Sequence, residues 1–270
     1  MLLSLSPAGR RYGYIKDKPD HRDLGMAFSS LSRATDPAVS NIALMGPVLD
    51  QGQEGSCTAH SAAADREFLH WKEFARRGQT VAPGSDGLYS PSFIYYLERK
   101  EDGSLEQGDC GSFGRTSCAV LRKYGCALRS DMPYVAGDFS TAPTQAQLDA
   151  ATKWATGQYH RLATVQDMKD CLASGYNFRI GFTVYESFEN DIGSDGVWTP
   201  STSEQVLGGH EVCCIGFDDR VNGGSFEVRN SWGESWGQSG NFWMRYQDAA
   251  DPNVLMDAWC QHLGFWGPHK

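Results

Sequence analysis

Apolar and small side chains recur at helical spacing through the first half of the chain. Between Ser56 and Arg77 this pattern is continuous, and Gly78 follows where a helix would end. Ser56 is suited to be the N-cap of this helix, which would place Cys57 in its first turn. Similar patterns predict helices over residues 90–100, 115–124, 144–155 and 165–174.

The hydrophobic period changes to two in the second half of the chain, which is the spacing of β-strands. Glycine-rich turns at 223–224 and 237–240 separate the last of these segments. The predicted strands span residues 178–184, 211–217, 225–230 and 241–246. Helices followed by strands predict an α+β protein, with a helical lobe against a sheet-rich lobe and a ligand site in the cleft between them.

The N-terminal 45 residues are expected to be loop-like, because prolines and glycines interrupt every longer pattern. No basic region precedes an apolar stretch of signal-peptide length, and no segment has about 18 consecutive apolar residues. We therefore expect no membrane association, and a protein that is cytoplasmic or released by a route without a signal peptide, such as in a viral or phage particle.

The net charge of -9 on 270 residues argues against a nucleic-acid partner, since such binding requires a surface rich in Lys and Arg. Hydrophobic residues make up 40% of the chain and charged residues 21%, which is typical of a globular protein. This length supports a substantial core without metals or disulfides. We favour a monomer and expect no cofactor.

The eight cysteines are expected to be mostly free, buried thiols that pack as small hydrophobes. Their pairing cannot be read from the sequence, although Cys110, Cys118 and Cys126 lie close enough together for a local bridge. No CxxC pair occurs, so zinc is not expected. The adjacent Cys213 and Cys214 would point to opposite faces of a strand.

Cys57 has the setting that best suits a nucleophile. Peptide N–H groups and the helix dipole at a helix N-terminus lower the pKa of a thiol, and the thiolate is the reactive form. Gly52 and Gly55 permit close approach of a bound carbonyl, and the amide of Gln51 is placed to donate to an oxyanion. Taken alone, this segment is equally consistent with a buried structural cysteine.

Two polar residues in the second half are suited to assist such a thiol. His210 precedes a predicted strand and could act as a base, while Asn230 ends the next strand and could orient the imidazole. Trp232 would shield their hydrogen bond from water. His60 is a rival base on the predicted helix, but a packing role is favoured for it. His70, His262 and His269 are expected at the surface.

Three segments together resemble the papain and cathepsin family of cysteine peptidases, and the match is most similar to bacterial and viral members. They are Gln51 to Cys57, Gly209-His210-Glu211-Val212, and Asn230-Ser231-Trp232-Gly233-Glu234-Ser235-Trp236-Gly237. Further similarity lies in Pro19 to Asp23, Ser90 to Tyr96 and Leu207 to His210. His210 and Asn230 follow Cys57 by 153 and 173 positions (210 − 57 and 230 − 57), slightly more than the ~130–150 typical of the family.

The resemblance implies a papain-like two-lobe fold, with an antiparallel β-barrel-like lobe beside the helical one. It divides the chain into a lead-in or short pro-like segment over 1–40 and a peptidase domain over 41–270. Within that domain the helical lobe would span about 45–145 and the β-rich lobe about 146–265. It also implies an endopeptidase that hydrolyses peptide bonds through a thiolate–imidazolium pair and an acyl-enzyme.

The same resemblance assigns roles to individual residues. The catalytic residues would be Cys57, His210, Asn230 and Gln51. The residues that bind a peptide or protein substrate would be Gly111, Gly209 and Trp232. Thr58 and Glu54 depart from papain, which has an aromatic residue and a disulfide cysteine at these positions. Two alternatives remain open: another acyl-transfer enzyme on this fold, such as a cell-wall amidase or transamidase, or an inactive relative that serves as a binding or particle component.

Overall fold

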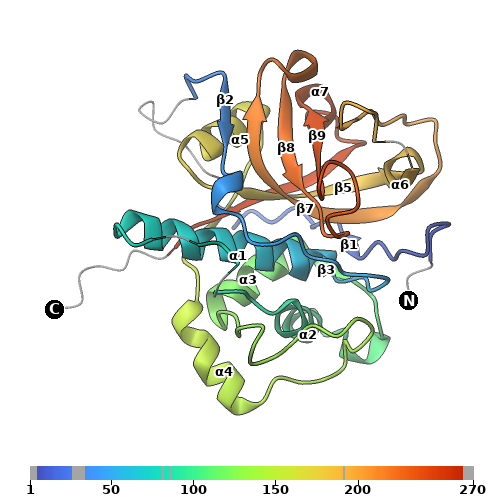
Figure 1. The fold of residues 1–270 in the computed structure, drawn as a ribbon. Helices are drawn as coiled ribbons and strands as arrows, with labels where there is room; N and C mark the ends of the chain where they lie inside the picture. Colours follow the sequence, from blue (N-terminus) through green and yellow to red (C-terminus); the bar gives the residue numbers. More distant parts are fainter. Residues whose placement is uncertain (1–4, 26–33, 81, 85–86, 191, 264–270) are drawn as a thin grey trace.

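The computed structural model describes residues 5–25, 34–80, 82–84, 87–190 and 192–263. The first four helices are α1 (Cys57–Arg76), α2 (Pro91–Glu101), α3 (Gly114–Lys123) and α4 (Gln145–Ala151). Figure 1 shows α1 running across the middle of the molecule, with the sheet on one side of it and α2, α3 and α4 on the other. The predicted helices are therefore confirmed to within one or two residues, except that α4 gives way to a 3-10 turn over Thr152–Trp154.

Some of the helix N-termini follow the expected capping chemistry. Ser90 caps α2, because its hydroxyl accepts a hydrogen bond from Phe93 N–H at 3.1 Å and Pro91 occupies the first turn. Ser56 occupies the N-cap position of α1 but makes no side-chain capping bond. Its hydroxyl instead lies 3.2 Å from Nδ1 of His60.

One mixed sheet of eight strands forms the other lobe. Its path runs β4-β10-β5-β7-β8-β9-β6, with β2 also paired to β7, and all pairs are antiparallel except β6 with β9. The bounds are β2 (Ala38–Ser40), β4 (Tyr159–Arg161), β5 (Phe178–Tyr185), β6 (Val197–Trp198), β7 (Val206–Asp218), β8 (Ser225–Arg229), β9 (Asn241–Arg245) and β10 (Leu255–Gln261). Three helices accompany the sheet: α5 (Val165–Ala173), α6 (Ser187–Asn190) and α7 (Tyr246–Ala249). Three further 3-10 turns span Ile42–Leu44, Leu105–Gln107 and Val221–Gly223.

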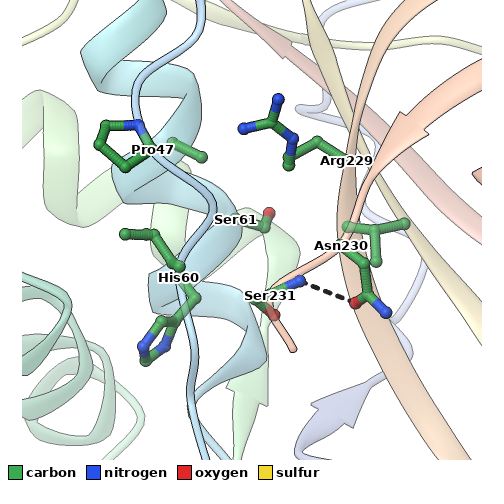
Figure 2. A pocket seen from close by; sticks show the side chains of 9 residues that line it. Pro47, His60, Ser61, Arg229, Asn230 and Ser231 are labelled. Atoms are coloured by element: carbon green, nitrogen blue, oxygen red, sulfur yellow. Dashed lines mark hydrogen bonds between the residues drawn. The ribbon is translucent and has the colours of Figure 1, made fainter. Parts of the chain in front are cut away.

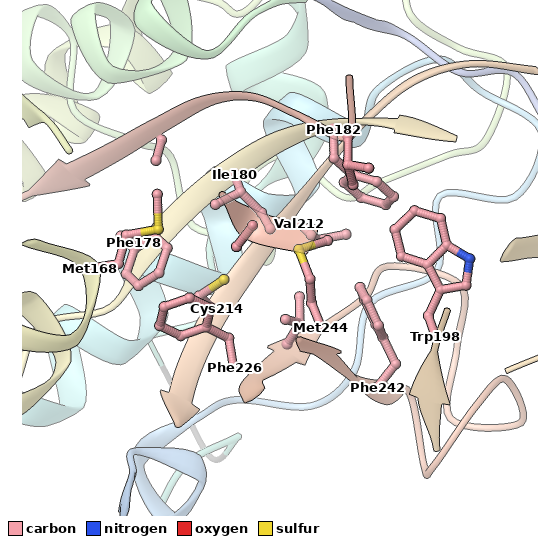
Figure 3. Packing of buried hydrophobic residues seen from close by; sticks show 14 of the residues in the cluster. Met168, Phe178, Ile180, Phe182, Trp198, Val212, Cys214, Phe226, Phe242 and Met244 are labelled. Carbon is pink, nitrogen blue, oxygen red and sulfur yellow. The ribbon is translucent and has the colours of Figure 1, made fainter. Parts of the chain in front are cut away.

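Two hydrophobic clusters meet along α1 and the long strand β7. One fills the sheet lobe and includes the aromatic side chains of β5, β8 and β9 (Figure 3). The other joins α1, α2 and α3. Cys213 belongs to the helical cluster and Cys214 to the sheet cluster, as expected for neighbours on a strand. The lobes are thus packed against each other at the first turns of α1, where Cys57 lies.

The N-terminal segment is more ordered than the loop that the sequence suggested. Its strand β1 (Tyr14–Ile15) pairs in parallel with β3 (Ser112–Phe113), and Gly13 forms a parallel bridge to Gly209. Both partners are distant in sequence, so no local pattern announces them. The segment therefore passes between the lobes instead of lying on the surface (Figure 1).

The expectation for His70 was wrong. Its side chain is 5% exposed, its ring stacks on Phe74 with centroids 4.5 Å apart, and Nδ1 lies 3.1 Å from the hydroxyl of Tyr89. His262 is only partly buried, and His269 lies outside the described residues. All eight cysteines are free and buried, as expected. No helix in the described part of the chain is both long enough and apolar enough to cross a membrane.

Candidate active site

Cys57 begins α1 and is entirely buried, with 0% of its surface exposed. Hydrogen bonding from the backbone of Glu211 and of Gly13 acts to lower the pKa of the thiol. Burial is the larger effect, and it raises the pKa of Cys57 to about 12. The helix N-terminus was expected to lower this pKa, but desolvation outweighs it here, so the structure holds a neutral thiol.

His210 lies on β7 and is also 0% exposed. Its Nε2 atom is 2.8 Å from Oδ1 of Asn230, and the same oxygen accepts a hydrogen bond from Ser231 N–H at 2.8 Å. Because the Ser231 amide can only donate, the atom it meets is an oxygen, and Nε2 of His210 must carry the proton. Nδ1 is then an unprotonated nitrogen, and it has no hydrogen-bond partner among the described residues.

Aromatic side chains surround the imidazole of His210. Trp232 stacks on it with ring centroids 4.9 Å apart and an interplanar angle of 30°. Phe182 and Phe188 approach from 5.8 and 6.3 Å. Burial lowers the pKa of His210 to about 3, against the opposing effect of the hydrogen bond to Asn230. The imidazole is therefore neutral in this form of the protein, as is the thiol.

Gln51 connects the loop before α1 to the loop after β8. Its Oε1 accepts from the hydroxyl of Ser231 at 2.6 Å, and its backbone N–H donates to Ser231 O at 3.0 Å. Nε2 donates one hydrogen to the carbonyl of Glu54 at 2.9 Å. The primary amide has a second N–H, which leaves one donor for a further acceptor.

The other histidine near the thiol is committed elsewhere. Nδ1 of His60 lies 2.9 Å from the carbonyl of Ser56, and its ring meets Tyr134 edge-on with centroids 4.5 Å apart. Burial lowers the pKa of His60 to about 4. A small pocket lies next to this residue, between α1 and the end of β8 (Figure 2). Asn230 and Ser61 line that pocket, whereas Cys57 and His210 do not.

Residues 10–17 of the chain pass against Gly55, just before Cys57, and lie against every residue that the sequence suggested for substrate binding. An added Cβ on Gly111 would lie 2.0 Å from Gly13 O, and one on Gly209 would lie 2.4 Å from Tyr14 O. Ser112 N–H donates to Gly13 O at 2.8 Å. The guanidinium of Arg10 lies 4.1 Å from the ring centroid of Trp232. This close passage of backbone explains why glycines occupy these positions.

Side chains hold this N-terminal segment on both sides of Gly13. The hydroxyl of Tyr12 donates to Glu189, and that of Tyr14 donates to Asp257 at 2.8 Å. Asp17 accepts hydrogen bonds at 3.0 Å from the backbone N–H of Arg115 and from the indole of Trp259. Sequence reasoning missed these residues, because their partners lie roughly a hundred or more positions away.

The described residues do not gather three or more of the side chains that bind metals into a group able to hold an ion. The chemistry that the arrangement can support rests on two groups: a buried thiol at the start of α1 and an imidazole on β7 that Asn230 orients. A thiol of this kind is the nucleophile of cysteine peptidases, which are hydrolases.

Comparison with known proteins identifies the family. Residues 31–261 match the model of the papain family of cysteine proteases, and the chain belongs to that family. It is 32% identical, over 285 residues, to an uncharacterized peptidase C1-like protein, L477, of Acanthamoeba polyphaga mimivirus. That match covers 95% of this chain and 88% of the viral protein.

Solved structures agree with this fold. The chain resembles xylellain, a cysteine protease from Xylella fastidiosa, with a TM-score of 0.80 and 32% identity. That match covers 93% of this chain and 96% of xylellain. The procathepsin B S9 of Trypanosoma congolense shares the fold, with a TM-score of 0.71, 17% identity, and coverage of 94% of this chain and 87% of that one. The predicted papain-like α+β fold is thereby confirmed.

Proposed function

We propose that this protein is a cysteine-type endopeptidase in which Cys57 is the nucleophile, His210 the base, Asn230 the residue that orients the base, and Gln51 an oxyanion donor. The hydrogen bond from His210 Nε2 to Asn230 carries the proposal. It fixes the tautomer in which Nδ1 is free to accept a proton. The strand β7, which carries His210, lies against α1, which begins with Cys57, because Ser61 of α1 donates a hydrogen bond to Glu211 of β7 at 2.7 Å.

The reaction proceeds in two acyl-transfer steps. Nδ1 of His210 takes the proton of Cys57, and the thiolate attacks the carbonyl carbon of the scissile peptide bond. The negative oxygen that forms accepts hydrogen bonds from the N–H of Cys57 and from the remaining N–H of Gln51. His210 then protonates the leaving amine, and water attacks the thioester to release the acid and restore the thiol.

The path of the N-terminal segment supports the endopeptidase mode. From Arg10 beside Trp232 to Asp17 beside Trp259, one continuous polypeptide runs past the residues proposed to bind the substrate. A cleft that is open at both ends accepts the middle of a substrate chain, whereas an exopeptidase closes one end. On this proposal Gly111, Gly209 and Trp232 contact the substrate, and residues 10–17 must leave before a substrate enters.

The decisive experiment is a peptide-library cleavage profile of the wild-type chain beside Cys57→Ala and His210→Ala. Internal cleavage by the wild type, lost in both variants, is the expected result. Equal cleavage by Cys57→Ala would reject the proposed nucleophile. Release of cell-wall muropeptides without peptide cleavage would show a different acyl-transfer reaction. Cleavage restricted to terminal residues would keep the catalytic residues and reject the endopeptidase mode.

A further inference from the structure

Behind the proposed catalytic pair lies a buried carboxylate that the reaction does not use. Glu211 follows His210 on β7, and its side chain is 1% exposed. Its Oε1 accepts a hydrogen bond from the hydroxyl of Ser61 at 2.7 Å. Ser61 lies on α1 four residues after Cys57, which is one helical turn. A single hydrogen bond therefore joins β7 to α1 one turn beyond the sulfur.

Arg179 of β5 holds the same carboxylate from the other side. It is 0% exposed, and its Nη1 lies 3.4 Å from Oε1 of Glu211, while its Nε lies 3.7 Å from Asp65 on α1. The first residue of α3, Gly114, packs against the same carboxylate, since an added Cβ on it would lie 2.8 Å from Oε2 of Glu211. Elements from both lobes thus converge on this one side chain.

Stability alone gives little reason for this arrangement. Burying a carboxylate and a guanidinium costs several kcal/mol per ion in desolvation, and apolar residues of similar volume would often be as stable or more so. A buried ion pair of this kind can instead serve to hold the elements that carry it in one fixed arrangement. Here the geometry concerns residue 211 itself, because hydrogen bonding from its backbone lowers the pKa of the Cys57 thiol.

We propose that Glu211 is a positioning residue whose carboxylate, held by Ser61 and Arg179, fixes β7 against α1. This contact holds the backbone of residues 210 and 211 against the first turns of α1, and so fixes the position of His210 relative to the helix that carries Cys57. The inference rests on the proposed function, since it assigns Glu211 a role in forming the reactive thiolate. A displacement of about 1 Å in such a site can cost on the order of a hundredfold in rate.

The charge of Glu211 and its position act on the thiol in opposite directions. Its negative charge raises the pKa of Cys57, whereas its backbone lowers that pKa. Burial raises the pKa of Glu211 itself to about 7. The positive charge of Arg179 and the hydrogen bond from Ser61 act to lower this pKa, whereas the negative charges of Asp17 and Asp257 act to raise it. Two other acidic residues face Glu211. Asp65 on α1 pairs with the same Arg179, and Glu98 on α2 interacts with Glu211 through its charge.

Two substitutions distinguish the effect of the position of the Glu211 carboxylate from the effect of its negative charge. Ser61→Ala leaves the carboxylate charged and removes its tie to α1. Glu211→Gln removes the charge and keeps an oxygen that accepts from Ser61, and its NH₂ replaces Oε2, which has no partner among the described residues. The matched control is Glu67→Gln, which alters an equally buried carboxylate of α1 that pairs with Arg129 at 2.9 Å.

The measurement is the rate of Cys57 alkylation by iodoacetamide at a fixed pH of about 8, followed by peptide mass mapping in the full chain. Well below the pKa of the thiol this rate is proportional to the thiolate fraction, and it needs no peptide cleavage. We expect Ser61→Ala to lower the rate about tenfold, the effect of raising the pKa of the thiol by one unit. Glu211→Gln is expected to raise the rate, and Glu67→Gln to leave it unchanged.

Peptide hydrolysis supplies a second readout, in which Ser61→Ala is expected to lower kcat about tenfold or more with KM unchanged. Alkylation rates of Ser61→Ala and Glu211→Gln that equal the wild-type rate, or that change in the same way as the rate of Glu67→Gln, would overturn the positioning role. Alkylation at a cysteine other than Cys57 would reject the proposed nucleophile instead, so the two failures are distinguishable.

Discussion

A single methyl group at Gly13 is expected to expose the nucleophile. An added Cβ on this residue would lie 1.7 Å from the carbonyl oxygen of Gly55, 2.5 Å from its carbonyl carbon and 2.9 Å from its Cα. All three atoms belong to the backbone, so no side-chain rotation relieves the contact. In Gly13→Ala the N-terminal segment must therefore move out of the site.

The size of the effect follows from the cost of overpacking. Forcing a methyl group into a closely packed site costs roughly 1–3 kcal/mol. Since about 1.4 kcal/mol is a factor of ten, the fraction of molecules with the segment displaced should rise about 5- to 150-fold. The rate at which Cys57 is alkylated should rise by the same factor if local opening limits it.

The assay is alkylation of the full chain at neutral pH, with the Cys57 peptide quantified by mass spectrometry. Gly25→Ala is the control, because it lies in the same N-terminal segment and an added Cβ there meets nothing within 4 Å. It should be labelled at the wild-type rate. Equal labelling of Gly13→Ala, Gly25→Ala and wild type would refute the idea that residues 10–17 close the site.

The contacts of other residues give three further predictions. Asn230→Ala should lower kcat about tenfold to a hundredfold in steady-state peptide hydrolysis, because the hydrogen bond that orients His210 is lost, and an unchanged kcat would contradict this. Burial lowers the pKa of His60 to about 4, so the folded protein holds this side chain neutral while the unfolded chain protonates it near pH 6.5. The free energy of unfolding should therefore be unaffected at neutral pH and fall by up to roughly 3 kcal/mol as the pH drops from about 6.5 to 4. Denaturant unfolding of His60→Gln should show a weaker loss over that range than the wild type does, and an identical loss would count against it. The sulfurs of Cys171 and Cys260 lie 3.1 Å apart, so refolding with glutathione disulfide should join them, with two thiols of glutathione released per bond, and a non-reduced peptide map with both cysteines free would disprove this.

Periodicity alone predicted the helices α1 to α5 and the strands β5, β7, β8 and β9, because apolar residues recur at helical or strand spacing along these segments. The strand β10 gave no such signal, since it carries two buried polar residues, Asp257 and Gln261. Both are satisfied only in the folded protein. Asp257 accepts from the hydroxyl of Tyr14, and Gln261 donates to the carbonyl of Cys118 at 2.9 Å. A pattern that depends on distant partners cannot be recognised from local spacing.

The candidate site also has features that could be predicted from the sequence and features that could not. Cys57, His210, Asn230 and Gln51 stand in segments that suggest this chemistry when they are taken together, through their resemblance to the papain family. The covering role of Gly13 was not visible, because its partners are backbone atoms of distant residues. The raised pKa of the Cys57 thiol was also unforeseen, since it comes from the burial of the side chain in the folded protein, which local sequence does not show.

The central claim is that one thiol among eight is the reactive one. The most direct test treats the protein with an epoxide inhibitor of cysteine peptidases and maps the labelled residue by mass spectrometry. We predict a single adduct on Cys57 and its loss in His210→Ala, where no base accepts the thiol proton. An adduct on any other cysteine, or undiminished labelling of Cys57 without His210, would contradict the claim.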